Sequence, residues 1–331
     1  MKGNWLYHLA VALSALDSPA LAQAARPALE WRLVADVALP GKAARFDYQS
    51  FDPTAGRLWI AHMGAGEILA FDVRRRQVVA RVPNMAGVTG VRVVPALERV
   101  FAALRAGHAV AVLDSRDGRV LAQVPGGRFP DGLAYASAAN RLYVSDEYGQ
   151  QELVIDVPSS TAHRPIPLGG EVGNTQYDPV EGRIWAAVQT RNELAVIDPL
   201  TDSVVNRVRL PGIEHPHGFY LDPEHRLIYV TGEENSRLGV LDMRKNRIVR
   251  LYPVGEKPDV LTFDAVRRRL YVAAESGVIT AFQVHGNTLE PLPKYQAPHA
   301  HSVAVDPATG LLYVPLENVG GRPVLRVLSL E

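Results

Sequence analysis

Seven aromatic residues recur at nearly constant spacing along the chain, and this repeat constrains the fold more than any other feature. They are Trp59, Phe101, Tyr143, Trp185, Tyr229, Tyr271 and Tyr313, with successive separations of 42, 42, 42, 44, 42 and 42 residues. A period in the forties, with several short alternating strands in each copy, is typical of a β-propeller and not of a helical solenoid. The sequence therefore predicts an all-β, seven-bladed propeller with four-stranded antiparallel blades.

Turn signals divide each copy into short strands. The first strand ends at an Asp-Pro turn, such as Asp52-Pro53 or Asp306-Pro307, where Asp can accept hydrogen bonds from the turn backbone and Pro presets φ. The last copy stops after its third strand, Val324 to Leu328, whereas residues 32–40 resemble the fourth strands of other copies. We expect this N-terminal strand to complete the seventh blade, so that the ring closes without an unpaired inner edge.

Residues 1–22 have the features of a secretory signal peptide. Lys2 is a short basic region, Leu6 to Leu16 is apolar, and Ala20-Leu21-Ala22 is an A-x-A cleavage site. The apolar stretch is too short to span a bilayer, and we expect no transmembrane segment. Residues 23–331 are predicted to form a single propeller domain that is periplasmic or secreted.

The amino-acid composition excludes some kinds of site and some kinds of binding partner. The chain has no cysteine, which excludes disulfides and thiolate zinc sites. Its 35 Lys and Arg residues balance 35 Asp and Glu residues, so no global field attracts nucleic acid. We expect a monomer that binds a small molecule or a protein partner, and not nucleic acid.

The repeat resembles a known family. The segments Arg141-Leu142-Tyr143-Val144, Tyr229-Val230-Thr231-Gly232 and Arg269-Leu270-Tyr271-Val272 are similar to the YVTN-repeat β-propellers of exported bacterial and archaeal proteins. The resemblance covers all seven copies and implies the fold. Similar propellers include surface-layer proteins, binding proteins, lactonases and streptogramin-type lyases, so the resemblance implies no single chemistry.

Two rings of mostly ionisable residues mark one end of the predicted channel, because loops from all blades converge there. Twelve residues before the anchors stand Asp47, Thr89, Asp131, Gly173, His217, Asp259 and His301. Four residues after them stand Met63, Arg105, Glu147, Gln189, Glu233, Glu275 and Glu317, with His62 beside the first. Arg45, His215 and His299 lie two residues outside the first ring, which gives two His-x-His segments. On a strand, His-x-His places both imidazoles on one face.

These residue types fit a divalent metal such as Zn, Mn, Mg or Ca, and equally a general base with a nearby acid. The candidate metal ligands are His215, His217, Asp259, His299, His301, Glu147, Glu233, Glu275 and Glu317. The other candidate residues of the mouth are Arg45, Asp47, His62, Arg105 and Asp131. A purely structural role, in which the Asp and His residues hydrogen-bond neighbouring loops, accounts for the same pattern.

Three functions remain open from the sequence. The first is an exported binding protein that holds a small ligand or partner over the mouth of the channel, with or without a metal. The second is a metal-assisted lyase or lactonase with His217 or His301 as the catalytic acid or base, and with Glu147, Glu233, Glu275 or Glu317 positioning the ion. Streptogramin lyases have a similar layout, but here the histidines fall in alternate blades. The third is a structural or adhesive module at the cell surface, which predicts no convergence of polar groups at the mouth.

Overall fold

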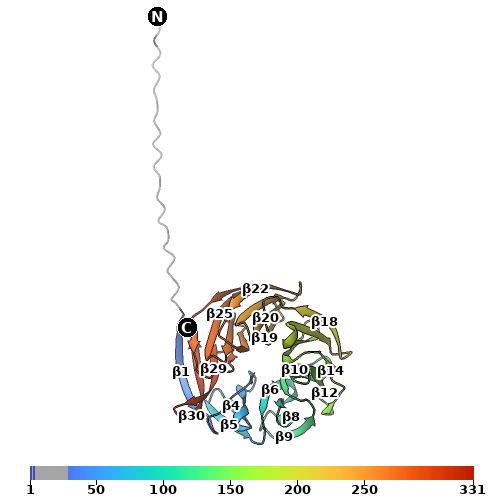
Figure 1. Cartoon of the computed structure of the whole chain (residues 1–331). Helices are drawn as coiled ribbons and strands as arrows, with labels where there is room; N and C mark the ends of the chain where they lie inside the picture. Colours follow the sequence, from blue (N-terminus) through green and yellow to red (C-terminus); the bar gives the residue numbers. More distant parts are fainter. Residues whose placement is uncertain (2, 4–28) are drawn as a thin grey trace.

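The computed structural model describes Met1, Gly3 and residues 29–331, and the described chain forms a ring of seven antiparallel sheets (Figure 1). This confirms the seven-bladed propeller. The predicted signal peptide, apart from Met1 and Gly3, lies outside the described residues. Helical structure in the described part is limited to three short 3-10 turns, η1 (Met63–Ala65), η2 (Pro95–Leu97) and η3 (Gln189–Arg191). None of the described helices is long and apolar enough to cross a membrane.

Consecutive strands build each of the first six blades: four strands in blades 1, 2, 4 and 5, and five in blades 3 and 6, where two short strands share the outer edge. Blade 1 contains β2 (Gln49–Asp52), β3 (Arg57–His62), β4 (Glu67–Asp72) and β5 (Gln77–Val82). Blade 2 contains β6 (Val88–Val94), β7 (Arg99–Leu104), β8 (Ala109–Asp114) and β9 (Val120–Pro125). Blade 3 contains β10 (Pro130–Ala136), β11 (Arg141–Asp146) and β12 (Gln151–Asp156), whose outer edge pairs with β13 (Thr161–Ala162) and β14 (Ile166–Pro167).

The remaining blades follow the same order. Blade 4 contains β15 (Val172–Asp178), β16 (Arg183–Val188), β17 (Glu193–Asp198) and β18 (Ser203–Arg209). Blade 5 contains β19 (Pro216–Asp222), β20 (Leu227–Gly232), β21 (Arg237–Asp242) and β22 (Arg247–Pro253). Blade 6 contains β23 (Pro258–Asp264), β24 (Arg269–Ala274) and β25 (Val278–His285), with β26 (Thr288–Pro291) and β27 (Tyr295–Gln296) on its outer edge.

The seventh blade joins the two ends of the described chain. Its strand order is β1 (Trp31–Ala38), β30 (Arg322–Leu330), β29 (Leu311–Val319) and β28 (Ala304–Asp306). In Figure 1 the blue β1 lies beside the red β30. The pairing runs from Trp31 opposite Leu330 to Ala38 opposite Val324, and Arg326 adds two hydrogen bonds to the Asp36 carboxylate, of 2.8 and 2.6 Å. The outer strand of this blade is therefore supplied by the N-terminal segment.

The hydrophobic core lies between adjacent blades and contains the aromatic anchors. Trp59, Tyr143, Tyr229 and Tyr271 are fully buried, and one core cluster combines Trp59 of blade 1 with Val91 and other apolar residues of blade 2. Three of the arginines two residues before the anchors, Arg57, Arg141 and Arg269, reach across to the next blade; Arg141, for example, pairs with Asp202 at 2.6 Å. The 42-residue period therefore reflects the repeated contact between one blade and the next.

One polar side chain departs from this core pattern. Glu152 in β12 is fully buried, and neither of its carboxyl oxygens has a hydrogen-bond partner. The corresponding strand positions of other blades hold Ile68, Val110, Leu194 and Leu238. Burial raises the pKa of the Glu152 carboxyl well above its usual value, so the folded protein keeps this group neutral.

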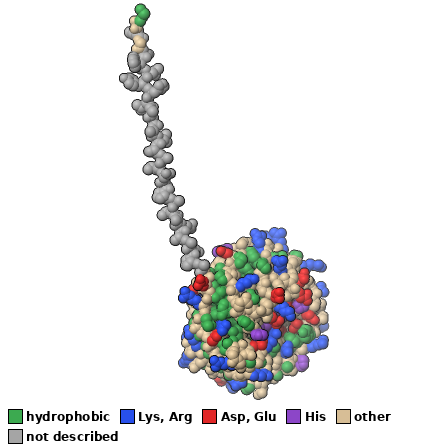
Figure 2. Space-filling view, turned by 60° about the vertical axis from the view of Figure 1, so that its left-hand side comes forward, with side chains coloured by type: hydrophobic (Ala, Val, Ile, Leu, Met, Phe, Trp, Pro, Cys, Tyr) green, Lys and Arg blue, Asp and Glu red, His purple; other side chains and the backbone are tan. Residues whose placement is uncertain are grey.

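The outer surface carries both signs of charge. On the face shown in Figure 2, Lys and Arg side chains are interspersed with Asp and Glu side chains, and neither sign forms a continuous field.

Candidate functional site

Irregularities in the inner strands place polar side chains at one mouth of the channel. The pairing of the first and second strands shifts register between Pro130 and Leu133, and between Pro258 and Leu261, with the same shift in blades 2, 4 and 5. A bulge of this kind leaves residues unpaired and redirects their side chains. The displaced residues include Asp131 and Asp259, and this explains why the ionisable ring falls at one repeat offset.

Close approach of neighbouring inner strands accounts for the glycines that follow this ring. A Cβ on Gly218 would lie 1.5 Å from the carbonyl oxygen of Asp259, and a Cβ on Gly90 would lie 2.0 Å from that of Asp131. Only glycine fits at these contacts. Tyr48 stands at the same repeat offset in blade 1 and carries the largest side chain there; it lines both the mouth and the channel beneath.

The cavity at the mouth has a volume of about 150 Å³. It brings together members of both rings predicted from the sequence: Arg45, Asp47, Met63, Thr89, Arg105, Asp131, Glu147, His217, Glu233, Asp259, Glu275 and His301, with Tyr48 and Phe129. Six carboxyl groups thus face two arginines and two histidines. Acidic groups predominate, and the cavity favours a cation over an anion.

His301 is the most heavily contacted residue of the cavity. Its Nε2 lies 2.9 Å from Asp259 Oδ2 and 3.2 Å from Asp47 Oδ1, and its Nδ1 lies 3.4 Å from Glu275 Oε1. Arg45 Nη2 is 2.9 Å from the same Glu275 oxygen and 3.0 Å from His301 Nδ1. The imidazole is therefore held between three carboxylates and one guanidinium.

These contacts shift the pKa values of His301, Asp259 and Glu275. Burial opposes protonation of His301, but Asp259 and Asp47 outweigh it and raise the pKa of the imidazole well above its usual value. Burial likewise opposes ionisation of Asp259, yet His301 and His217 hold the pKa of that carboxyl well below its usual range. The hydrogen bond from His301 lowers the pKa of Glu275 to about 2, with a further contribution from Arg45. Two ionised carboxylates therefore face a protonated imidazole near neutral pH.

A second cluster surrounds His217 on the opposite side of Asp259. His217 Nε2 lies 3.2 Å from the Tyr48 hydroxyl and 3.3 Å from Asp259 Oδ1, and its Nδ1 lies 3.1 Å from Gln189 Nε2. The Tyr48 hydroxyl also donates to Asp131 Oδ2 at 3.5 Å. Burial, assisted by the Asp47 carboxylate and opposed by His217, raises the pKa of Asp131 to about 7. Asp131 is therefore poised to hold or release a proton near neutral pH.

Three of the predicted ligands form a compact donor set. One ligand atom each of Asp259, Glu275 and His301 lies within 4.8 Å of the other two, a spacing that a single ion can bridge. Asp259 Oδ1 is buried, and its contact with His217 Nε2 at 3.3 Å does not have hydrogen-bond geometry. A buried carboxylate oxygen that accepts no well-formed hydrogen bond carries an energetic cost that a bound cation would relieve.

The structure does not bring His215 and His299 into this cavity. Both residues have a positive φ, of 54° and 61°, and so the extended alternation expected of His-x-His is lost at each. His215 lies on the rim, 3.3 Å from Glu233 Oε2, and the hydrogen bond with Glu233 raises the pKa of its imidazole. His299 is exposed.

Two further candidate residues, His62 and Glu317, also lie outside the cavity at the mouth. His62 is fully buried, stacks on Phe46 with 4.1 Å between ring centroids, and contacts Glu67 Oε1 at 3.1 Å. Burial lowers the pKa of this imidazole, which packs against Phe46 inside the protein and does not line the mouth. Glu317 is half-buried and does not line the mouth.

Tyr48 and Gln189 contact the two ring nitrogens of His217. Sequence reasoning missed Tyr48, and it placed Gln189 in the second ring without counting it among the candidate site residues. A signal for Tyr48 was present, because it is the single aromatic residue at a repeat offset where Gly90, Gly132 and Gly218 stand.

Comparisons with known proteins support the fold and leave the function open. No known family model matches the chain, and no curated protein sequence matches it. Among solved structures, the chain is similar to a chain of Kuenenia stuttgartiensis hydrazine synthase, with a TM-score of 0.73, 15% identity, and coverage of 87% of this chain and 96% of that one. It is also similar to the structure of U3-55K, with a TM-score of 0.75, 12% identity, and coverage of 89% and 98%. The RRP9 WD40 repeats give a TM-score of 0.75 and 12% identity, with coverage of 91% and 100%. At these identities the likeness concerns the propeller fold alone.

Proposed function

We propose that this protein is a binding module whose channel mouth holds a divalent cation and, through it, a small ligand. The observation that carries the proposal is the cluster of Asp259, Glu275 and His301, whose ligand atoms lie within 4.8 Å of one another at an acidic cavity. One imidazole and two carboxylates suit Zn²⁺ or Mn²⁺ better than Mg²⁺ or Ca²⁺, which prefer oxygen ligands alone. Because His301 is protonated near neutral pH in the free protein, binding of the cation requires the imidazole to release a proton. Three protein ligands leave coordination positions open for a ligand atom.

Arg45 regulates access to this donor set in our proposal. Its guanidinium contacts both Glu275 and His301, and so occupies part of the space that a cation needs. The side chain is 41% exposed and can swing toward solvent. Replacing it by Ala removes a competing positive charge, and we expect Arg45→Ala to bind the cation more tightly than the wild type.

Calorimetric titration with Zn²⁺, Mn²⁺, Mg²⁺ and Ca²⁺, on protein first treated with chelator, tests the proposal. We expect one site, with Zn²⁺ or Mn²⁺ bound most tightly. Asp259→Asn should weaken uptake by about tenfold or more, because a charged ligand is lost. His299→Ala is the matched control, since it removes an exposed imidazole of the same His-x-His segment and should leave uptake unchanged.

The proposal fails if the wild type takes up none of the four cations. It also fails if Asp259→Asn binds as tightly as the wild type while both proteins keep the same melting temperature.

The geometry of Asp131, Tyr48 and His217 favours one second candidate, a metal-assisted lyase or lactonase at the same mouth. A carboxyl group with a pKa of about 7 beside a tyrosine hydroxyl and an imidazole suits proton transfer. In this candidate His217 and Asp131 exchange the proton, while His301 stays with the cation. A panel of lactones assayed with wild type and Asp131→Asn tests it; turnover that the substitution leaves unchanged would exclude this role. An adhesive module predicts no polar convergence at the mouth, so the acidic cavity speaks against that function.

Family and location are part of the same proposal. The repeated Leu-Tyr-Val segments support membership of the YVTN-repeat propellers, and the features of residues 1–22 support export to the periplasm or medium. Mass spectrometry of protein from an expressing bacterial host tests the export proposal: a mature chain should begin at Gln23 and fractionate outside the cytoplasm.

A further inference from the structure

A second cavity lies in the channel on the other side of Tyr48 from the mouth. Its volume is about 340 Å³, within the range of small-molecule sites. It extends to Pro53 and Pro307 in the turns at the far end of the channel. Tyr48 lines both cavities and separates them. Nothing in the proposed function uses this space.

The lining of this cavity contrasts with that of the mouth. Arg92 is the single charged residue among its lining residues, and no carboxylate lines it. In the described structure the Arg92 side chain is open to the space of the channel, although it lies deep inside the ring. This position lowers the pKa of its guanidinium, and Tyr220 is the one titratable group that partly offsets the lowering. An exposed guanidinium inside a channel, without an acidic partner, is a ready site for an anion.

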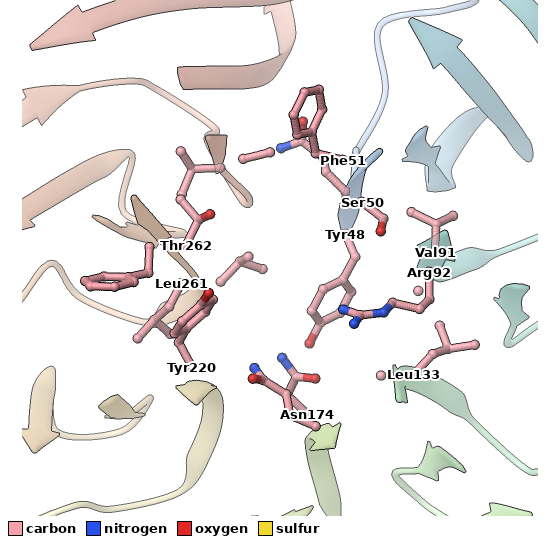
Figure 3. A pocket seen from close by; sticks show the side chains of 18 of the residues that line it. Tyr48, Ser50, Phe51, Val91, Arg92, Leu133, Asn174, Tyr220, Leu261 and Thr262 are labelled. Atoms are coloured by element: carbon pink, nitrogen blue, oxygen red, sulfur yellow. The ribbon is translucent and has the colours of Figure 1, made fainter. Parts of the chain in front are cut away.

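Further donors face the same space. Figure 3 shows the side chains of Arg92, Tyr220 and Asn174 pointing into the cavity from three different blades. The oxygen of the Asn174 amide accepts a hydrogen bond from the Thr175 backbone at 2.7 Å, which leaves the amide nitrogen for a ligand. Gln176, by contrast, is occupied, because its amide bonds Phe219 and Leu221 of the next blade.

Apolar walls complete the site. Val91, Leu133, Leu261 and Phe51 line the cavity beside the polar groups (Figure 3). Phe263 also lines it. An inorganic anion would leave these walls in contact with water alone. A ligand with a charged head and an apolar body would use both parts of the lining.

We propose that this lower cavity binds a small organic carboxylate, whose head is held by Arg92 with Tyr220 and Asn174, and whose apolar or aromatic body packs against Val91, Leu133 and Leu261. The site is independent of the cation site. The two cavities then select opposite charges on either side of Tyr48.

Ligand-detected NMR and equilibrium dialysis with benzoate and hexanoate as probes test the proposal. We expect both carboxylates to bind the wild type, and the neutral benzamide and inorganic phosphate to bind far more weakly. Arg92→Gln should weaken benzoate binding by about tenfold or more, the usual effect of losing a charged hydrogen bond. Arg105→Gln is the matched control, because it removes an arginine from the mouth instead and should leave benzoate binding unchanged.

Two further variants keep the test decisive. Tyr220→Phe retains the ring and should weaken benzoate by about threefold through loss of one neutral hydrogen bond, even if Arg92→Gln does not fold. Asp259→Asn should retain benzoate binding, so that failure of the cation site and failure of this site are told apart. The proposal is overturned if benzoate does not bind the wild type, if benzamide binds as tightly, or if Arg92→Gln and Tyr220→Phe both bind benzoate as the wild type does.

Discussion

Replacing Glu152 should stabilise the protein, and the gain should grow with pH. Its carboxyl group is fully buried with no hydrogen-bond partner, at a strand position where other blades have aliphatic residues. An unsatisfied buried polar group costs about 1–3 kcal/mol. We therefore expect Glu152→Leu to raise the free energy of unfolding by about 2 kcal/mol at a pH where the carboxyl is neutral in both states.

The pH dependence follows from the direction of the pKa shift. Burial raises the pKa of Glu152 in the folded state above its ordinary value of 4.5, so above that pH the unfolded chain releases a proton that the folded chain retains. The destabilisation caused by Glu152 is therefore smallest below pH 4.5, where the carboxyl is neutral in both states, and stability is lost as pH rises from 4.5 toward the folded pKa. The loss amounts to about 1.4 kcal/mol for each pH unit in this window.

Urea unfolding at several values between about pH 5 and pH 8, on wild type, Glu152→Gln and Glu152→Leu, measures both effects. Glu152→Gln is the matched control, since it keeps the shape and a polar group but cannot ionise. Other titrating groups contribute equally to all three proteins, so the difference from wild type isolates Glu152. A difference between wild type and Glu152→Gln that stays constant with pH would refute the reasoning.

Three further outcomes are expected. Deletion of residues 23–40 removes β1 and its Trp31 packing, and should lower the melting temperature by about 6 °C or more; an unchanged melting curve would show that β1 does not close the ring. Tyr143→Ala should cost about 3–5 kcal/mol in chemical unfolding, because the anchor is fully buried, and should leave cation uptake intact. The double variant His217→Ala with His301→Ala should lose cation uptake in calorimetry, and equal uptake by this variant and the wild type would contradict our assignment of the mouth.

The sequence predicted the fold well because the propeller repeats one contact seven times. Each anchor meets the neighbouring blade in the same way, so a single pattern fixes blade number and strand order. The same regularity predicted where polar residues gather, since an offset of twelve residues before the anchor falls at the bulge in blades 2 to 6, as at Asp131 and Asp259.

Local backbone geometry limited the prediction of individual side chains. Alternation along a strand places His215 beside His217, but the left-handed backbone at His215 turns its ring to the rim. Arg92 and Tyr220 line the channel from the regularly paired part of the inner strands, opposite the anchors Phe101 and Tyr229, and no repeated ionisable position marked them in the sequence. Such features depend on contacts between blades, which one repeat does not encode.

The pairing of β1 with β30 also has a consequence for the order of events during folding. The ion pair between Asp36 and Arg326 joins residues 290 positions apart, so β1 cannot pair with β30 until the chain has been made as far as that strand. Blades 1 to 6 contain only neighbouring strands and are free to form in sequence. During that interval β1 offers a solitary strand edge, with Leu33 and Val34 exposed even in the finished ring. This interval is when the chain is most open to pairing with another copy of itself.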